Sequence, residues 1–588
     1  MTSSLLCTIC EVRCTIPEGG TGRCGMYVNQ AGQIVEQYPD SYLVQYPISI
    51  ETAPLLHFYP REKFIQVSTI GCNFRCNGCV SELLTRTVKE FAPSLMHKTP
   101  EMIIQKAHDE KCRGIFFAIN EPAVSYPTFS RLAQAARDAD LLVGCSTNGY
   151  FTSNSLQALI PNIDAVAVGV KGNNDLAYQE CGAQTVEPVF RNISTLVENG
   201  VHVETSVVYE QGAEESVLTT CKKIADISEE IPIQVMRFIP FGPAELSLEP
   251  GILASERLCD QIREHSRYVY LFNSPGSSYL HTRCTRCGAV VVQREFYGPM
   301  GAHVVDQRKN WVCSCGYHVP FTGVYAHTNY QEDGMMGGYR PTRALETIKA
   351  VTTCLGITDE QTSARVWVDF ISQNYIDVMH KKIQSIDTFY HVITHLAEIT
   401  GRIPEGIDLI HYLKERTAGI TRQVEGLSRP RVLYVMGTPL FVLNEDRFEN
   451  NMVMTAGGEP LNRNFPRKGK PGIMISPEDL NQIDPEIIIM SGFLSTPVED
   501  AYTICKEQGI DIQAVRNQKI YAMHPSWDFG NPRWILGLSF LAQVLHPGEI
   551  KIDLEKEADK FYQKFYHMPY SEAKPNRSFF RPSAGNDP

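Results

Sequence analysis

The feature that most constrains this chain is a cysteine-rich loop after an apolar, strand-like run. Segment 66–85 reads QVSTIGCNFRCNGCVSELLT and contains Cys72, Cys76 and Cys79. Cysteine thiolates hold [4Fe–4S] clusters, and three of them leave one iron open to a small molecule. Such a motif indicates a cluster site more strongly where a strand precedes it and a helix follows, as the sequence predicts here. The segment predicts an open cluster site, with a loop of reduced or zinc-binding cysteines as the alternative.

Length and charge narrow the classes to which the chain can belong. At 588 residues it is too long for one core, so we expect about three or four domains. A net charge of −12 disfavours a nucleic-acid surface. No apolar run reaches the roughly 18 residues of a membrane span, and the first residues do not resemble a signal peptide. We expect a cytoplasmic protein with small-molecule or protein partners, no nucleic acid and no membrane.

Four further cysteines are grouped near the start of the chain, in segment 7–24. Because cytosolic thiols are kept reduced, the 18 cysteines of the chain favour metal or cluster ligation over disulfides. The group consists of Cys7, Cys10, Cys14 and Cys24. Glycines near the last cysteine allow tight turns, and four sulfurs make a closed site for zinc, iron or an auxiliary cluster. A structural or electron-transfer role is favoured over catalysis, and a loop of free cysteines is the alternative.

A third cysteine group lies in segment 281–318. A knuckle, HTRCTRCG, is followed after a strand-rich hairpin by WVCSCG, and the four cysteines are Cys284, Cys287, Cys313 and Cys315. Pairs so spaced bind zinc or rubredoxin-like iron in a closed site, with an auxiliary cluster as the next choice and the neighbouring histidines, His281 and His318, as substitute ligands.

The remaining cysteines are isolated, and most are expected to be buried apolar thiols. They are Cys112, Cys145, Cys181, Cys221, Cys259, Cys354 and Cys505. Among them, Cys145 attracts most interest because it precedes a polar strand end.

Residues 63–283 alternate apolar, β-branched runs with amphipathic stretches. Six such units predict the α/β class, with a parallel sheet wrapped by helices as a partial (β/α)6 TIM-like barrel. In this architecture chemistry is located at the carboxyl ends of the strands, where the cluster loop also falls. Polar residues end the other strands: Asn120, Glu121, Ser146, Asn148, Lys171 and Arg237. One polar strand end is ordinarily just solvated, but several on one rim predict a site.

These motifs together resemble the radical S-adenosylmethionine (SAM) superfamily over about residues 1–325. The matching segments are the cluster loop, FFAINEP, STNG, VKG, GVHVETSVV, MRFIP, CTRCGAVVVQRE and the N-terminal cysteines. They are similar to the AmmeMemoRadiSam-type branch, whose relatives include pyruvate formate-lyase activating enzymes. The resemblance implies reductive cleavage of SAM to a 5′-deoxyadenosyl radical, which abstracts hydrogen from a small-molecule or protein substrate. It also implies a reductant such as ferredoxin or flavodoxin.

The resemblance assigns roles to the residues on the rim. Cys72, Cys76 and Cys79 hold the catalytic cluster, and Asn120 and Glu121 take the SAM amino group. The other cofactor-binding residues are Ser146 and Asn148, near the methionine carboxylate or ribose, with Lys171 and Arg237. The chemistry agrees, because an ammonium needs a carboxylate or carbonyl partner and a carboxylate needs donors.

Two positions depart from the activating enzymes. Gly78 stands where a large apolar residue often lies, and Gly169 where an aspartate is common two residues before the lysine. A carboxylate that could bind a cation is therefore missing. The departures disfavour a glycyl-radical activase, which is the second hypothesis, without affecting SAM cleavage.

The C-terminal part has a different pattern. Segment 341–425 is mostly helical, and strands then return. Residues 386–548, with RPRVLYVMGTPLFV, ISPEDLNQIDPEIIIM and AVRNQKIYAMH, resemble one lobe of periplasmic proteins that bind vitamin B12, haem or iron–siderophores. The resemblance implies a three-layer α/β lobe for a corrinoid or another metal chelate. The candidate ligand contacts are His524, Trp527, Asp528 and Arg533.

Two alternatives stay open for this lobe. It could serve only packing or a dimer interface, or the whole chain could be a non-catalytic protein that binds or carries a metal chelate. The expected organisation is a cysteine-rich module (1–50), a radical SAM barrel (51–280), a knuckle module (281–325), a helical linker (326–425), a binding-protein-like lobe (426–548) and a C-terminal helix and tail (549–588).

Overall fold

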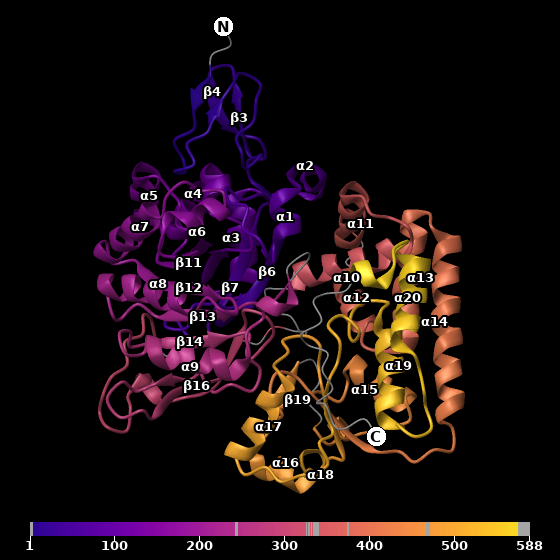
Figure 1. The fold of residues 1–588 in the computed structure, drawn as a ribbon. Helices are drawn as coiled ribbons and strands as arrows, with labels where there is room; N and C mark the ends of the chain where they lie inside the picture. Colours follow the sequence, from indigo (N-terminus) through magenta and orange to yellow (C-terminus); the bar gives the residue numbers. More distant parts are fainter. Residues whose placement is uncertain are drawn as a thin grey trace. The chain divides into compact units, whose positions relative to one another are not determined.

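The computed structural model describes residues 4–240, 245–324, 326, 330, 332, 340–372, 375–465 and 471–573. The chain forms two compact units (Figure 1). Unit 1 comprises Met1–Ala244, Ala254–Asn273 and Ser278–Tyr339, and unit 2 comprises Glu245–Leu253, Ser274–Ser277 and Arg340–Pro588. The finer division into six regions stays a prediction. None of the described helices is long and apolar enough to cross a membrane.

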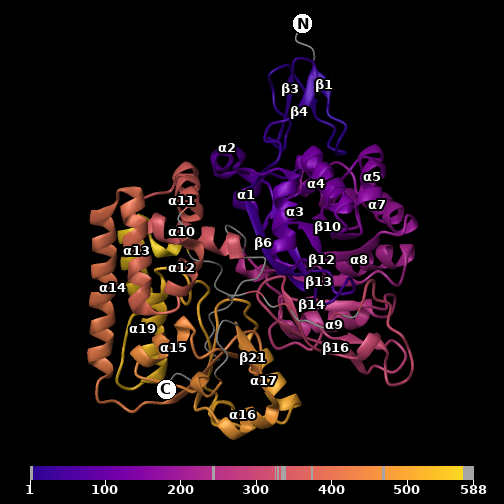
Figure 2. The same cartoon turned by 180° about the vertical axis from the view of Figure 1, so that it is seen from behind.

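An eight-stranded sheet organises unit 1 (Figure 2). Its order is β14-β13-β12-β11-β10-β9-β7-β6. The bounds are β6 (Val44–Ser49), β7 (Lys63–Ser68), β9 (Gly114–Phe117), β10 (Leu142–Thr147), β11 (Ala165–Val170), β12 (His202–Tyr209), β13 (Ile233–Arg237) and β14 (Val269–Phe272). Strands β7 and β9 to β14 run parallel, and β6 pairs antiparallel with β7. The predicted α/β class with a barrel-like parallel sheet is confirmed.

Helices connect the parallel strands, as parallel pairs require. They include α3 (Pro100–Asp109), α4 (Tyr126–Asp138), α5 (Ser153–Leu159), α7 (Glu187–Glu198), α8 (Glu214–Ile227) and α9 (Ile252–Ile262). Every residue of β9 and of β14 is buried, which fits a sheet covered on both faces. The six predicted strands are β7 and β9 to β13, and β14 is a seventh parallel strand that the sequence did not predict.

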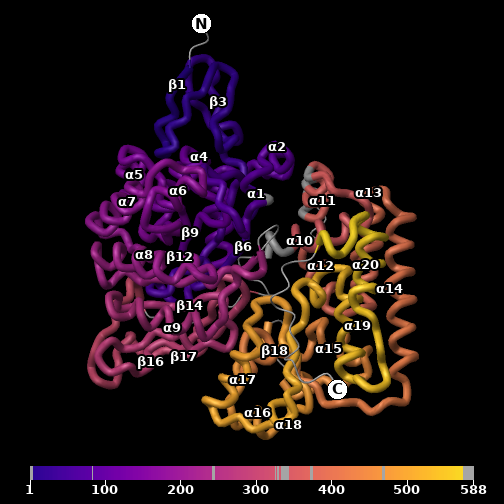
Figure 3. The backbone as a smooth tube through the Cα atoms, in the orientation of Figure 1, coloured from indigo at the N-terminus to yellow at the C-terminus, as the bar shows by residue number. Residues whose placement is uncertain are grey.

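Three small antiparallel sheets precede or follow the main sheet in the chain. At the N-terminus, β1 (Leu5–Leu6) pairs with β2 (Thr15–Ile16), and β3 (Tyr27–Gln30) pairs with β4 (Gln33–Glu36). The tube in Figure 3 follows this segment into the sheet. After the sheet, β15 (Thr282–Arg283), β16 (Val290–Phe296) and β17 (Ala302–Gln307) form a three-stranded antiparallel sheet.

Unit 2 begins with helices, as the sequence predicts. They are α10 (Arg340–Cys354), α11 (Glu360–Ser372), α12 (Tyr375–Lys382), α13 (Ile386–Thr400) and α14 (Ile403–Val424). Ser385 caps the start of α13, where its hydroxyl accepts a hydrogen bond from the Thr388 N–H, and Gly401 ends it in the left-handed conformation.

The second sheet has the order β21-β19-β18-β22-β23, with β20 also paired to β18. Its strands are β18 (Arg431–Val435), β19 (Phe441–Leu443), β20 (Glu459–Pro460), β21 (Gly472–Met474), β22 (Ile487–Met490) and β23 (Ile520–Ala522). Leu433 and Ile488 share a core with Ala501 of α17 (Val498–Glu507). Helix α15 (Phe448–Thr455) contacts β18 and packs on α19 (Trp534–Leu545). Unit 2 therefore contains the second α/β sheet that the sequence predicts.

Candidate active site

The cluster loop leaves β7 and leads into α1 (Glu82–Arg86), in the predicted order of strand, loop and helix. Gly71 has a φ of 83°. A Cβ at this residue would lie 3.0 Å from the Cγ of Met26 and 3.1 Å from the Cys24 oxygen. The loop thus depends on glycine where the N-terminal segment approaches it closely.

The three loop thiols all lie in the loop that follows β7. Cys72, Cys76 and Cys79 are each partly buried. Burial is the main reason that the pKa of Cys72 is raised, and the charges of Cys79 and Cys76 raise it further. The structure therefore gathers the three predicted cluster ligands on the carboxyl side of β7.

Lys171 follows β11 and faces these sulfurs. Burial opposes its charge, yet the sulfurs of Cys76, Cys181, Cys79 and Cys72 together raise its pKa. A partly buried ammonium among thiols favours their ionised form, which is the form that ligates metals. Lys171 thus supplies positive charge to the predicted cluster site.

A further thiol, Cys181, lies at the loop. It follows α6 (Asp175–Glu180), and its carbonyl accepts a hydrogen bond from the Arg75 N–H at 2.7 Å. The neighbouring Cys181 thiol is the main reason that the pKa of Cys76 is lowered, and the charge of Lys171 contributes to the shift. The sequence did not predict this neighbour, because Cys181 is distant along the chain and has no spacing motif of its own.

Glu121 is buried at the end of β9. Its carboxylate accepts hydrogen bonds from the Thr147 hydroxyl at 2.8 Å, the Asn148 N–H at 2.7 Å and the Ala123 N–H at 3.1 Å. Burial raises its pKa to about 7. The carboxylate thus joins the ends of β9 and β10, and Lys171 acts on it from the next strand end.

Asn120 and Asn148 fasten the cluster loop to the strand ends. The Asn120 amide donates to the carbonyls of Ile70 at 3.1 Å and Gly71 at 3.2 Å, and its oxygen accepts from the Thr69 N–H at 3.0 Å. The Asn148 amide donates to Asn73 Oδ1 at 2.6 Å.

The amide of Asn148 also lies 3.9 Å from the Cys72 sulfur. Asn120 therefore positions the loop, whereas Asn148 reaches the first cysteine. The roles predicted for them toward SAM stay predictions.

The remaining two predicted rim residues lie on β10 and β13. Ser146 is half-buried on β10. Arg237 is buried at the end of β13, and its guanidinium donates to the Asn273 carbonyl at 3.0 Å. The Asn273 amide in turn donates to the Arg237 carbonyl at 2.8 Å. Arg237 thus connects β13 to the residue that follows β14, and a role toward SAM stays a prediction for both residues.

The N-terminal cysteines form a small core of their own. Cys7 is buried there with Ile16 and Tyr27, and Cys14 and Cys24 pack against it. The pKa of Cys24 is raised mainly by burial, and the charges of Cys14 and Cys7 add to the shift.

Cys10 connects this group to the active site. It forms a β-bridge with Phe151, and the Asn73 side chain lies against its thiol. The N-terminal group therefore contacts the cluster loop through Cys10, a proximity that the sequence did not predict.

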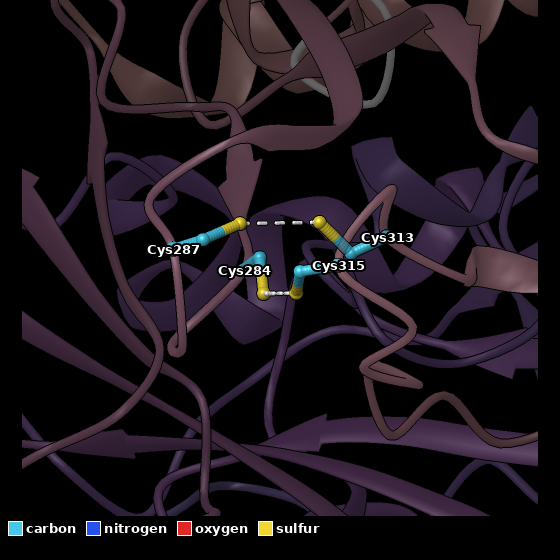
Figure 4. A group of neighbouring side chains, drawn as sticks. All are labelled: Cys284, Cys287, Cys313 and Cys315. Atoms are coloured by element: carbon cyan, nitrogen blue, oxygen red, sulfur yellow. Dashed lines mark hydrogen bonds between the residues drawn. The ribbon is translucent and has the colours of Figure 1, made fainter.

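The knuckle cysteines form a compact group (Figure 4). The sulfurs of Cys284 and Cys315 are 3.6 Å apart, those of Cys287 and Cys313 are 3.4 Å apart, and all four lie within 4.8 Å of one another. Zinc–sulfur bonds of about 2.3 Å in a tetrahedron separate sulfurs by about 3.8 Å. The group therefore fits one tetrahedral ion.

His281 lies next to the knuckle but has another partner. Its Nδ1 accepts a hydrogen bond from the Arg294 N–H at 3.2 Å, and burial with nearby arginine charges lowers its pKa to about 4. The four sulfurs complete a tetrahedron without it. His318 is exposed and pairs with Val312 in a β-bridge.

The candidate ligand residues of unit 2 lie in one loop after β23. His524, Trp527 and Asp528 are buried, and the rings of His524 and Trp527 stack with their centroids 4.5 Å apart. Asp528 accepts hydrogen bonds from the Ser491 hydroxyl at 2.9 Å and the Gly492 N–H at 3.1 Å. Arg533 donates to the Asn531 side chain and the Tyr562 hydroxyl. These contacts fix the loop within unit 2, and ligand contact stays a prediction.

A parallel α/β sheet with a three-cysteine loop at its carboxyl edge defines an iron–sulfur enzyme of the barrel type. The model of the radical SAM superfamily matches residues 67–215, which include this loop. The chain is 30% identical over 302 residues to the uncharacterized protein MJ0808 of Methanocaldococcus jannaschii, across 50% of this chain and 88% of that protein. The chain belongs to the radical SAM superfamily.

Two solved structures similar to the chain are periplasmic binding proteins. A solute binding protein from Veillonella parvula is 24% identical with a TM-score of 0.30, over 33% of this chain and 62% of that one. The molybdate periplasmic binding protein MolA of Haemophilus influenzae is 25% identical with a TM-score of 0.28, over 32% and 58%. The chain spans about six-tenths of the length of these proteins.

Membership of the superfamily implies a [4Fe–4S] cluster and SAM, and the residues present fit both. Three neighbouring thiols suit the cluster. The buried carboxylate of Glu121 suits the SAM ammonium, and the ammonium of Lys171 suits the negative charge of the thiolates.

Proposed function

We propose that unit 1 cleaves SAM reductively at a [4Fe–4S] cluster held by Cys72, Cys76 and Cys79. The observation that carries the proposal is the position of the three-cysteine loop at the carboxyl end of β7. There the Cys72 sulfur lies 3.9 Å from the Asn148 amide, and the Asn148 N–H donates to the buried Glu121 carboxylate at 2.7 Å. When bound, the cluster would supply the electron that converts SAM into methionine and a 5′-deoxyadenosyl radical.

The protein residues around the loop would bind and orient SAM. Glu121, in its ionised form, would accept hydrogen bonds from the SAM ammonium, and its three existing donors keep the carboxylate in place. Lys171 would balance the negative charge of the thiolates. Asn120 would keep the loop at the end of β7.

The flanking cysteine groups would serve as closed sites. The knuckle, with four sulfurs within 4.8 Å, suits zinc or a single iron that stabilises the three-stranded sheet. The N-terminal group is next to the cluster loop and suits zinc, iron or an auxiliary cluster.

The substrate would be a small molecule or a protein from which the radical abstracts hydrogen, and the electron would come from a ferredoxin- or flavodoxin-type reductant. For unit 2 we propose a metal chelate as ligand, with a corrinoid favoured. Support for the corrinoid comes from the sequence of the lobe and from the aromatic and charged loop that contains His524 and Trp527.

Electron paramagnetic resonance tests the cluster assignment. Anaerobically reconstituted, dithionite-reduced protein should give a [4Fe–4S]⁺ signal that changes shape when SAM is added, because SAM binds the open iron. Cys79→Ala should lose this signal, while Cys221→Ala, which changes a buried thiol of α8, should retain it. A signal of full intensity in Cys79→Ala would contradict the assignment.

A further inference from the structure

A groove of about 600 Å³ lies beside the knuckle in unit 1. Its walls include Glu229, which precedes β13, Tyr268, which precedes β14, and knuckle residues between His281 and Gly288. Glu229 and Tyr268 lie at the amino ends of their strands, whereas the cluster loop follows the carboxyl end of β7. Because β7 and β9 to β14 run parallel, the groove lies at the opposite edge of the sheet from the proposed SAM site.

Positive charge is concentrated in this groove, although the chain as a whole carries a net charge of −12. The charged side chains that line it are those of Arg263, Arg267, Arg283, Arg286, Glu229 and Glu264. Arg267 pairs with Glu229 at 3.4 Å and with Glu230 at 2.8 Å. Arg263 pairs with Asp260 at 3.0 Å. Two of the four arginines are thus already balanced by carboxylates of the protein.

The other two arginines, Arg283 and Arg286, flank Cys284 of the knuckle and are exposed. Neither forms an ion pair with any carboxylate among the residues that the structure describes. Nη1 of Arg283 donates to the Gly288 carbonyl at 3.4 Å, and the Arg286 guanidinium lies over the Tyr317 ring at 5.9 Å from its centroid. Since a guanidinium has five N–H donors, both keep donors for a ligand.

Two neutral side chains add donors to the same groove. His281 accepts a hydrogen bond at Nδ1 from the Arg294 N–H, so in the neutral ring Nε2 carries the proton and can donate. Ser266 is buried, and its hydroxyl has no hydrogen-bond partner among the described residues. Cationic and neutral donors on one groove are the complement of an anion.

We propose that this groove binds a phosphate-bearing small molecule, with Arg283 and Arg286 as its phosphate ligands and His281 as a neutral donor. The planar fork of a guanidinium matches two phosphate oxygens at once. The volume falls within the range of about 300–1,000 Å³ that is usual for small-molecule sites. The net charge of −12 disfavours nucleic acid as the source of the phosphate. The site is separate from the cluster loop, so it does not rest on the proposed function.

The two arginines have a second effect on the knuckle. They flank Cys284, so they also offset the negative charge of a bound divalent ion with four thiolates. That role requires neither the groove nor the His281 donor. Phosphate binding and metal retention therefore have to be measured on the same samples.

Equilibrium dialysis with radiolabelled inorganic pyrophosphate tests the proposal. The full-length protein, with its metals bound and without SAM, should bind one pyrophosphate per chain at low ionic strength. The affinity should fall as salt is added, because the contacts are between exposed charges. Elemental analysis of the dialysed protein checks that pyrophosphate has not removed the knuckle ion.

Variants locate the bound pyrophosphate. Arg283→Gln and Arg286→Gln should each raise Kd about tenfold or more while the metal content stays that of the wild type, since each removes a charge-assisted hydrogen bond. Arg308→Gln is the matched control: Arg308 is an exposed arginine that follows β17 of the same small sheet, but it does not line the groove. This variant should bind like the wild type.

Cys79→Ala separates this inference from the proposed function. It should bind pyrophosphate like the wild type even if its cluster is lost, because the groove lies at the other edge of the sheet. Loss of binding in Cys79→Ala would place the pyrophosphate at the cluster loop and overturn the groove. No binding to the wild type, an equal Kd in Arg283→Gln and Arg308→Gln, or binding of a single-stranded oligonucleotide without binding of pyrophosphate would also overturn the proposal.

Discussion

At the scale of single residues, the site depends on charges held in partly buried surroundings. Lys171 faces four sulfurs, and Glu121 is buried with three hydrogen-bond donors. Because burial disfavours ionisation, each group needs an opposite charge nearby to keep its ionised form stable. Under the proposed function the SAM ammonium would bind the ionised form of Glu121, so SAM binding should depend on pH.

SAM affinity should fall as the pH decreases from 8 to 6. Burial raises the pKa of Glu121 to about 7, so the carboxylate is mostly ionised at pH 8 and mostly protonated at pH 6. One pH unit below the pKa, about a tenth of the molecules keep the charge that binds the ammonium, so Kd should rise about tenfold. Equilibrium dialysis with reconstituted, unreduced protein measures this change.

Two variants serve as controls for the pH effect. Glu121→Gln should bind SAM weakly and with little pH dependence. Glu36→Gln should keep the dependence, because Glu36 is a second buried carboxyl whose pKa is raised to about 7, but it accepts hydrogen bonds from Thr128, away from the loop. A Kd in wild-type protein that does not change between pH 6 and 8 would exclude Glu121 as the ammonium partner.

Gly169→Asp should change the electrostatic surroundings of the cluster. A Cβ at this residue would lie 3.1 Å from the Lys171 Nζ. A carboxylate in Gly169→Asp would pair with that ammonium and leave the sulfurs more negative, which should lower the reduction potential by on the order of 60 mV. Potentiometric titration followed by electron paramagnetic resonance measures the shift, and Gly169→Asn is the neutral control. An unchanged potential in Gly169→Asp would show that Lys171 does not act on the cluster.

At the scale of elements, the cluster loop is held in place by contacts with the N-terminal segment and with the residues after β9. Gly71 lies where β7 ends and the N-terminal segment crosses, and Asn120 fastens the loop from β9. The knuckle, in contrast, would be held together by an ion bound to its own four sulfurs, because two short turns bring these sulfurs within 4.8 Å of one another. The two elements should therefore respond differently to substitution and to metal removal.

Gly71→Ala should destabilise the protein and reduce its iron content. A left-handed φ of 83° costs a residue with a Cβ about 1–2 kcal/mol, and the new methyl would press on Met26 and Cys24. Urea unfolding measures the stability, and elemental analysis measures the iron.

Gly200→Ala is the matched control for backbone strain, because Gly200 has a φ of 75° and a Cβ there would meet nothing within 4 Å. Gly200→Ala should lose similar conformational free energy with no loss of iron. Equal iron content in the two variants would argue against a loop held by the N-terminal segment.

Removal of the knuckle ion should lower the melting temperature of the wild-type protein. Ligation by four thiolates contributes folding free energy, about 10 kcal/mol in small zinc-binding peptides, so a strong chelator should unfold the three-stranded sheet first. Differential scanning calorimetry with and without chelator measures this effect. Cys284→Ser should show a low melting temperature that the chelator no longer changes, and a chelator effect of the same size in this variant would contradict the site.

At the scale of the whole molecule, the sequence predicted the features that come from repeated patterns or from residues close together in the chain. Apolar runs ending in polar residues predicted six strands, and the spacing of Cys284, Cys287, Cys313 and Cys315 predicted one compact group. Contacts between distant segments were not predictable. The Cys181 carbonyl accepts a hydrogen bond from the Arg75 N–H of the cluster loop, and the Asn73 side chain of the same loop lies against Cys10, although these residues are far apart in the sequence. No sequence pattern at the end of α6 or in the N-terminal segment indicates which distant residues lie beside them.

Product analysis after SAM turnover tests the central claim most directly. Reconstituted protein, incubated anaerobically with SAM and dithionite, should form 5′-deoxyadenosine and methionine in equal amounts, as measured by liquid chromatography. Cys76→Ala should form neither above background, and Cys221→Ala should match the wild type. Turnover in Cys76→Ala at the wild-type rate, or none in wild-type protein that contains a full cluster, would contradict the assignment of this loop as the SAM-cleaving site.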